Sequence, residues 1–281
     1  MKRSLMYFVA LAPAMAFMPS VAAAPAAGAP VVAILAFDNN SIGKDAKDFD
    51  GIGKGVMDIL ITDLASNPKF RVVDRERVQQ ILAEQNLTKS GAVDAETAVR
   101  VGKLLGACYS IYGGFMRDLM GGNAITAHTT SNETGQIENP QKVLSKGDDV
   151  MALIAQLSAK LSSDMKLASC GATRSASATP TQQGGNMAAA VKEAPAPAAA
   201  PAVSAAAPNQ QYAMVLPPDQ VKKLHETKVD AKTMQLYARA LDAQDHKDKA
   251  KAVELLRQVV AKAPTFGPAT DRLTALTKSG N

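Results

Sequence analysis

Phe70-Arg71-Val72-Val73-Asp74-Arg75 joins a short apolar segment to a residue that can begin a helix. Residues 70–73 are mainly aromatic and β-branched, which is typical of a buried strand. The carboxylate of Asp74 can accept hydrogen bonds from the free amide groups of a first helical turn. We therefore expect a strand that ends before Asp74, a helix that carries Val78, Ile81 and Leu82, and a surface ion pair between Asp74 and Arg75.

The segments around this unit alternate between strand and helix patterns. Residues 31–37 (VVAILAF) form a short apolar run that predicts a buried strand. Asp94 and Asp148 are each placed to begin a helix, and residues 108–116 and 124–130 are interpreted as adjacent strands. Apolar residues recur at helical spacing at Ile52, Val56, Ile59, Leu60 and Leu64; at Ala98, Val101, Leu104 and Leu105; and at Val150, Leu153, Ile154, Leu157 and Leu161. The pattern predicts a small α/β domain with a mixed sheet over residues 30–170.

Further motifs give this order of elements a resemblance. They are Ile81-Leu82-Ala83-Glu84-Gln85-Asn86-Leu87, Ser90-Gly91, Thr97-Ala98 and Gly102-Lys103-Leu104-Leu105-Gly106-Ala107. Together with residues 70–75, they resemble the family of the curli production component CsgG from Val31 to Leu167. The resemblance implies a small α/β domain used for assembly or secretion in the bacterial cell envelope.

The pore-forming members of that family cross the outer membrane with two inserted hairpins. Each membrane-crossing strand needs about 9 to 11 residues. In this sequence the corresponding connections are Arg117 to Asn123 and Glu138 to Gly147, and neither can supply two such strands. We therefore expect that the protein does not form a transmembrane pore by itself.

The N-terminal segment has the layout of a secretory signal peptide. Lys2 and Arg3 precede an apolar run from Leu5 to Met18, and Ala22-Ala23-Ala24 offers a cleavage point. An uncleaved anchor is the alternative, but a span of the bilayer needs about 20 apolar residues, and this run is shorter. We expect a signal peptide over residues 1–24, a mature chain without a transmembrane segment, and a periplasmic protein that meets the outer membrane only through partners.

The two cysteines, Cys108 and Cys170, bear on both lipidation and cross-linking. Neither lies at the end of the signal segment, where many members of the resembled family carry a lipid, so we expect a protein that is not a lipoprotein. An oxidising compartment would allow the two cysteines to form a disulfide. Two unpaired thiols are the alternative, and the sequence leaves both open.

The C-terminal part divides into a linker and a helical module. Residues 171–216 are rich in Ala, Pro, Ser and Gly, which predicts a disordered linker. Residues 217–281 return to helix formers, and Ala252, Leu256 and Pro264 have the spacing of a tetratricopeptide repeat. Because such a module is too small to be stable alone, we expect it to dock on the first domain, on another copy or on a partner.

Composition and motifs argue against several classes of function. The formal net charge is +5, but no cluster of Lys and Arg and no Trp is present, so nucleic-acid binding is not expected. The run Gly51-Ile52-Gly53-Lys54-Gly55 has the spacing of neither a P-loop nor a dinucleotide fingerprint. We expect these glycines to let the loop enter the helix closely, with Lys54 in solvent. His128, His225 and His246 are scattered, so no metal site is expected. We predict no cofactor and no enzymatic activity.

The leading hypothesis is therefore a non-enzymatic accessory protein of envelope assembly or secretion that binds protein partners, with self-association left open. An activator of a peptidoglycan synthase, like the lipoprotein LpoB, is the first alternative, and a nucleotide-binding enzyme is the second. The loop from Asp38 to Gly55 follows a strand, as functional loops often do. The groove around Tyr237 is the expected ligand face of the tail. The predicted partner-binding residues are Asp38, Asn39, Asn40, Lys54, Tyr237 and Leu241.

Overall fold

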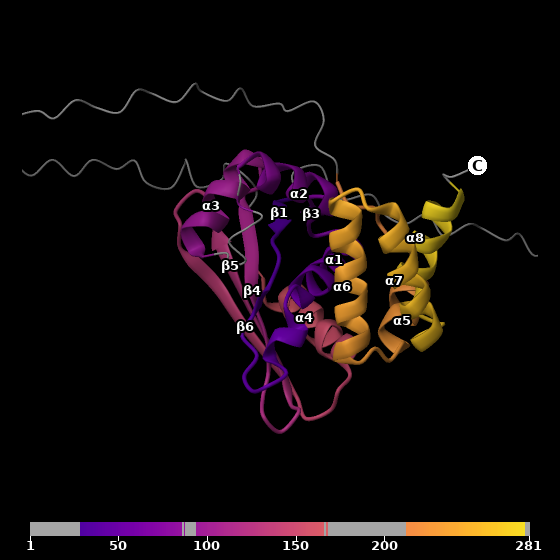
Figure 1. Ribbon diagram of the computed structural model, residues 1–281. Helices are drawn as coiled ribbons and strands as arrows, with labels where there is room; N and C mark the ends of the chain where they lie inside the picture. Colours follow the sequence, from indigo (N-terminus) through magenta and orange to yellow (C-terminus); the bar gives the residue numbers. More distant parts are fainter. Residues whose placement is uncertain (1–28, 86, 88–93, 166, 168–211, 279–281) are drawn as a thin grey trace, which may run out of the picture.

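The computed structural model describes residues 29–85, 87, 94–165, 167 and 212–278 (Figure 1). The predicted signal peptide, most of the predicted linker and Cys170 lie outside these residues. The strands are β1 (Val31–Ile34), β2 (Asp38–Asn39), β3 (Arg71–Val72), β4 (Tyr109–Arg117), β5 (Asn123–Ser131) and β6 (Ile137–Ser145). The helices are η1 (Ala46–Phe49), α1 (Ile52–Ala65), α2 (Arg75–Glu84), α3 (Ala95–Leu104), α4 (Val150–Asp164), α5 (Pro218–Glu226), α6 (Ala231–Asp245), α7 (Lys249–Lys262) and α8 (Gly267–Lys278).

The strands form one mixed sheet in the order β3-β1-β4-β5-β6, and β2 pairs with β4 beyond the end of β1. Strand β1 runs parallel to both β3 and β4, whereas β4, β5 and β6 are antiparallel neighbours. The predicted α/β class with a mixed sheet is therefore confirmed.

Helices cover both faces of this sheet. Because successive side chains of a strand point to opposite faces, β1 sends Val32 and Ile34 into one core and Val31 and Ala33 into the other. The first core is built with α1 and α4, and the second with α2 and α3. This burial of both faces explains the continuous apolar run of residues 31–37.

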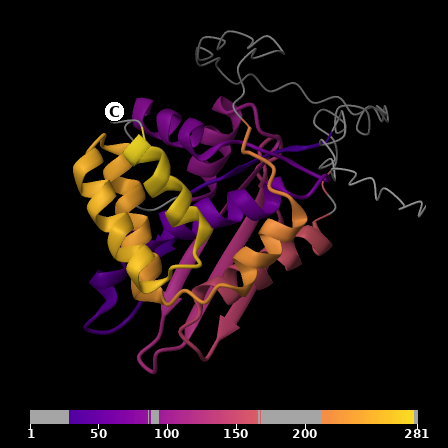
Figure 2. The same ribbon diagram turned by 90° about the vertical axis from the view of Figure 1, so that its right-hand side faces the viewer.

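The C-terminal helices pack on the outside of α1 and α4, as the orange to yellow ribbons of Figures 1 and 2 show. Helix α6 lies against α1, α7 packs on α6, and α8 packs on α7. Arg272 of α8 also donates a hydrogen bond to the hydroxyl of Tyr237 in α6. The core that contains α1 and α4 continues without a break into the tail, where Met234, Tyr237 and Leu241 are fully buried. The tail thus docks on the first domain, one of the three docking partners predicted for it.

Local capping agrees with the sequence in two helices and differs by one residue in a third. Asp74 accepts a hydrogen bond from the amide of Glu76, and Asp94 from the amide of Thr97, each at 2.8 Å. The predicted cap Asp148 is replaced by its neighbour Asp149, which accepts from the amide of Ala152 at 3.2 Å. Asp148 instead pairs with Arg117 at 2.5 Å, because a charge at the end of β4 competes for it.

Residues 138–147, which the sequence analysis treated as a connection, lie mostly in the nine-residue strand β6. This prediction was wrong because β6 is an edge strand with a mostly exposed, polar set of side chains. Backbone pairing with β5 forms the strand without an apolar pattern. Pro140 fits such a position, since an edge strand can dispense with one amide donor.

The segment directly before α5 is also packed, although the predicted linker extended to residue 216. Tyr212 bridges to Val73, and the guanidinium of Arg71 lies 3.9 Å from the centre of the Tyr212 ring. The amide of Ala213 donates to the carbonyl of Val72 at 2.9 Å, and the amide of Leu216 to the hydroxyl of Ser66 at 3.2 Å. We call residues 212–216 the strap.

Candidate functional site

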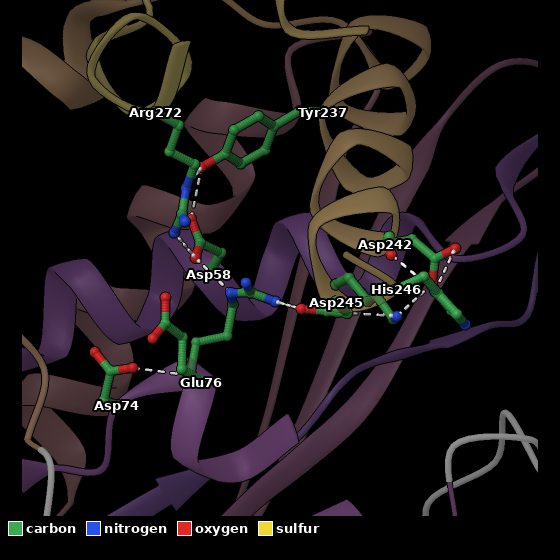
Figure 3. A network of polar contacts seen from close by, with 10 residues as sticks. Asp58, Asp74, Glu76, Tyr237, Asp242, Asp245, His246 and Arg272 are labelled. Atoms are coloured by element: carbon green, nitrogen blue, oxygen red, sulfur yellow. Dashed lines mark hydrogen bonds and ion pairs between the residues drawn. The ribbon is translucent and has the colours of Figure 1, made fainter. Parts of the chain in front are cut away.

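A network of charged side chains, buried at Asp58 and Arg75, joins the α/β domain to the C-terminal helices. It contains three carboxylates and three cationic side chains from α1, α2, α6 and α8 (Figure 3). They are Asp58, Asp242 and Asp245, and Lys54, Arg75 and Arg272. The balance of charge matters because an unpaired charge in a buried position would cost several kcal/mol.

Asp58 of α1 is the centre of one half of the network. Its Oδ1 atom lies 2.5 Å from Nη2 of Arg272 and 3.4 Å from Nε of Arg75. Its Oδ2 atom accepts a hydrogen bond of 2.7 Å from the hydroxyl of Tyr237. Burial and the neighbouring Asp58 both raise the pKa of Tyr237, so the phenol stays protonated and acts as a donor.

Arg75 connects this half to the other. Its Nη1 atom donates to Asp245 at 2.7 Å, and Asp245 also lies 3.2 Å from the ammonium of Lys54, which pairs with Asp242 at 2.5 Å. The prediction that Arg75 forms a surface ion pair with Asp74 is therefore wrong, because Arg75 is buried and pairs with Asp245 and Asp58. The guanidinium is only 5% exposed, because the docked tail covers it and supplies its partner.

The glycine-rich run at the start of α1 serves close packing. A Cβ atom on Gly53 would lie 1.6 Å from the carbonyl oxygen of Phe37, and one on Gly55 would lie 2.8 Å from the sulfur of Met234. Gly51 has a φ of 86°, which a glycine adopts without strain. The expectation that these glycines permit close approach is confirmed. Lys54 is held by two carboxylates instead of being solvated, so the run has no phosphate-binding geometry.

The predicted partner-binding residues have several fates in the structure. Tyr237 and Leu241 are fully buried in the joint core, so the ligand face expected there is already covered by α1. Lys54 belongs to the ionic network. Asn39 holds the loop after β2, donating to the carbonyl of Ala46 and to Asp50, each at 2.7 Å. These four side chains are thus engaged within the chain.

Asp38 and Asn40 remain at the sheet end that this loop covers. Asp38 lies on β2 opposite Gly114, and the amide of Asn40 donates to the carbonyl of Phe115 at 2.7 Å. A Cβ atom on Gly114 would collide with the side-chain amide of Asn40. Both residues therefore fasten the loop to β4.

Large apolar side chains are exposed at the same end of the sheet. Ile42, Leu119 and Met120 are 54%, 76% and 95% exposed, and we call these three residues the apolar tip. The amide of Ile42 donates to the carbonyl of Arg117 at 3.0 Å, which holds the loop beside the β4–β5 turn. A Cβ atom on Gly43 would lie 2.8 Å from Leu119, so the loop and the turn are in contact.

A cavity of about 460 Å³ lies between the strap, α1, the start of α2, α5 and α8. A second one, of about 730 Å³, lies on the other side of Arg75, between α2 and the α6–α7 turn. In the described part of the chain, no group of three or more His, Cys, Asp or Glu residues could hold a metal ion. No helix there combines the length and hydrophobicity that a membrane span requires.

Sequence reasoning did not single out Asp58, Asp245, Arg272 or helix α5. One signal was available for Asp58. Besides its apolar stripe, α1 carries Met57 and Ile61, which are also buried, so the helix is apolar on almost all sides. A helix of that kind is buried on all sides, and a carboxylate within it requires a partner from another element.

The architecture is that of an α/β domain with helices on both faces of its sheet, to which a tail of four helices is docked. The family model described as "Curli production assembly/transport component CsgG" matches residues 15–117. These residues therefore carry a CsgG-family domain, and the resemblance is confirmed over this range. A search of curated proteins finds no match.

Solved structures share part of the chain at low similarity. The LpoB C-terminal domain from Salmonella enterica is 16% identical, with a TM-score of 0.32 and coverage of 43% of this chain and 86% of that chain. Lipoprotein GNA1162 from Neisseria meningitidis is 11% identical, with a TM-score of 0.35 and coverage of 48% of this chain and 99% of that chain. A PelC dodecamer from Paraburkholderia phytofirmans is 13% identical, with a TM-score of 0.29 and coverage of 49% of this chain and 89% of that chain.

Proposed function

We propose that this protein is an exported, non-enzymatic accessory protein of cell-envelope assembly or secretion that binds a protein partner through the apolar tip. The CsgG-family match over residues 15–117 supports the envelope role. The signal-peptide layout of residues 1–24 supports export to the periplasm without a lipid anchor.

The observation that carries this proposal is the docking of the tail on its own α/β domain. Helix α1 covers the face of α6 that contains Tyr237 and Leu241, so this face binds within the chain instead of binding a separate protein. The helical tail then acts as a brace that holds the α/β domain rigid. Partner binding falls to surfaces that remain exposed.

The apolar tip is the best such surface. A single exposed apolar residue is ordinary, but three that meet at one end of a sheet expose an apolar patch, and such patches mark interaction sites. The loop is fastened by backbone hydrogen bonds from Asn40 and Ile42 to β4, so the patch is preorganised. A short hairpin turn of this kind also agrees with a protein that does not form a pore by itself.

The test is cross-linking in intact cells. A photoreactive amino acid at position 120 is expected to capture a distinct partner. The double variant Leu119→Ser and Met120→Ser, probed from a neighbouring position in the same turn, is expected to lose that product with unchanged thermal stability. Leu104→Ser is the matched control, since Leu104 is 48% exposed on α3, away from the tip. The proposal fails if the double variant captures the same partner as the control.

The identity of the captured protein also separates the alternatives. A component of a secretion or assembly system supports the proposed role, whereas a peptidoglycan synthase would favour the activator alternative. The glycine-rich run no longer supports the hypothesis of a nucleotide-dependent enzyme, because the ammonium of Lys54 pairs with Asp242 and Asp245. Calorimetric titration with ATP is therefore expected to show no saturable binding.

A further inference from the structure

We infer that the cavity between the strap and helices α1, α2, α5 and α8 is a second binding site, which takes a peptide segment with a lysine or arginine side chain beside apolar side chains. Its volume of about 460 Å³ lies within the range of about 300–1,000 Å³ that is usual for ligand sites. The site is independent of the apolar tip, so each proposal can fail without the other.

The floor and rim of the cavity offer apolar contacts. Ile61 and Leu224 lie on opposite helices, and Met214, Leu216 and Pro268 line the remaining sides. Met214 is 77% exposed although the strap around it is fixed to β3 and to the end of α1. Docking of the tail therefore does not use this side chain. Exposed methionine is suited to an adaptable binding surface, because its side chain is flexible and polarisable.

The charges that line the cavity divide into a paired set and an unpaired set. Asp58, Arg75 and Arg272 belong to the ionic network, in which three carboxylates balance three cations. Asp74, Glu76, Asp271 and Lys223 also line the cavity, and none of them makes an ion pair within 4.0 Å among the described residues. Three carboxylates against one ammonium leave this unpaired set negative.

Asp74 and Glu76 lie at the start of α2. Asp74 caps the helix, and the hydrogen bond from the backbone amide of Glu76 holds the Asp74 carboxylate in place (Figure 3). A ligand cation at this position would gain two partners, and an apolar neighbour on the same peptide would reach Met214 or Leu216. An anionic ligand would instead meet repulsion.

The proposal is tested by titrating the purified, ¹⁵N-labelled protein with three peptides and following amide chemical shifts. The probe is acetyl-Ala-Leu-Lys-Leu-Ala-amide; one control replaces Lys with Glu, and the other replaces both Leu residues with Ser. We expect shifts at Met214, Glu76 and Asp271 with the lysine peptide. Its affinity is expected to exceed that of either control by about tenfold, because each control removes one of the two kinds of contact.

Variants then assign the effect to the cavity. Glu76→Lys is expected to weaken binding of the lysine peptide by about tenfold. Glu84→Lys, at an exposed position at the end of the same helix, is expected to change the affinity less than about twofold. Asp271→Asn provides a second variant in α8 should Glu76→Lys disturb folding. The inference is overturned if the lysine peptide causes no shifts at millimolar concentration, if the glutamate peptide binds equally well, or if the cavity variants bind like the control.

Discussion

The hydroxyl of Tyr237 donates a 2.7 Å hydrogen bond to Oδ2 of Asp58, across 179 positions of the chain. Tyr237 belongs to the C-terminal helices and Asp58 to the first helix of the α/β domain, and both are buried. The ring of Tyr237 also packs edge-on against Phe266, with 5.0 Å between ring centroids. One side chain thus contributes to the tail's own packing and to its attachment.

Tyr237→Phe is expected to lower the free energy of unfolding by about 1–3 kcal/mol, because it leaves a buried carboxylate oxygen without its donor. Urea denaturation measures the change. Tyr112→Phe is the matched control, since no hydrogen bond of the Tyr112 hydroxyl is present among the described residues, and it should change the value by less than about 0.5 kcal/mol. Equal effects of the two substitutions would contradict the role given to Tyr237.

Arg75→Met is expected to cost about 3–5 kcal/mol, because Asp245 and the buried Asp58 each lose one of their two cationic partners. Arg77→Met, in the same helix, is the control. Among the described residues the Arg77 side chain hydrogen-bonds only to Gln80, in an exposed position, so its replacement should cost less than about 1 kcal/mol. Chemical denaturation of both variants measures the change in the free energy of unfolding. A small decrease for Arg75→Met would show that the ion pairs contribute little to stability.

Gly53→Ala is expected to destabilise the protein by about 3 kcal/mol or more, since the added Cβ atom would overlap the carbonyl oxygen of Phe37. Relief would require α1 to move away from the end of β1. Gly267→Ala serves as the control, because a Cβ atom there meets no atom within 4 Å. Thermal melting that shows equal effects at both positions would refute the close approach.

The stability of the tail is expected to depend on pH through His225. Its Nε2 atom lies 2.8 Å from Oδ2 of the buried Asp63, and this hydrogen bond raises the pKa of His225 above 6.5, although partial burial opposes the shift. Protonated His225 is therefore favoured in the folded state. Its contribution is complete below pH 6.5 and is lost as the pH rises through the folded-state pKa.

Urea denaturation across a pH series from below 6.5 into the alkaline range measures this dependence. His225→Gln should remove the part of the loss of stability with rising pH that comes from the His225–Asp63 pair. His246→Gln should retain it, since His246 is 73% exposed. An unchanged pH profile in His225→Gln would contradict the assignment.

A disulfide between Cys108 and Cys170 is one of the two states that the sequence leaves open, and it stays a prediction because Cys170 lies outside the described residues. We expect that a thiol-specific reagent labels neither cysteine in the unfolded, unreduced protein and labels both after reduction. Peptide mapping by mass spectrometry should then recover residues 108 and 170 in one cross-linked fragment. Labelling without reduction would instead establish two free thiols.

Much of the secondary structure could be predicted because its causes are local. The carboxylates of Asp74 and Asp94 cap helices whose amide donors lie two and three residues away. The apolar spacing of residues 52–64 likewise predicted the position of α1, which runs from Ile52 to Ala65. Strand β6 escaped prediction because its partner is the backbone of β5, which leaves little pattern in its own side chains.

The candidate sites were harder to predict, since they join residues far apart in the sequence. Lys54 was expected in solvent and Arg75 at the surface, yet each pairs with Asp245, which is 191 or 170 positions away. Tyr237 was expected to face a separate protein, but its partner is Asp58 of the same chain. The residue types were correctly recognised as polar or apolar, while their environments were not.

By itself, the sequence determined the caps, the apolar stripes and the alternation of strands and helices, because these depend on neighbours within a few residues. Only the tertiary structure decided that the tail docks on α1, which charges become buried and which apolar side chains stay exposed at the tip and at the strap. The physical reason is that desolvation and ion pairing depend on what covers a side chain, and here the covering residues come from the far end of the chain.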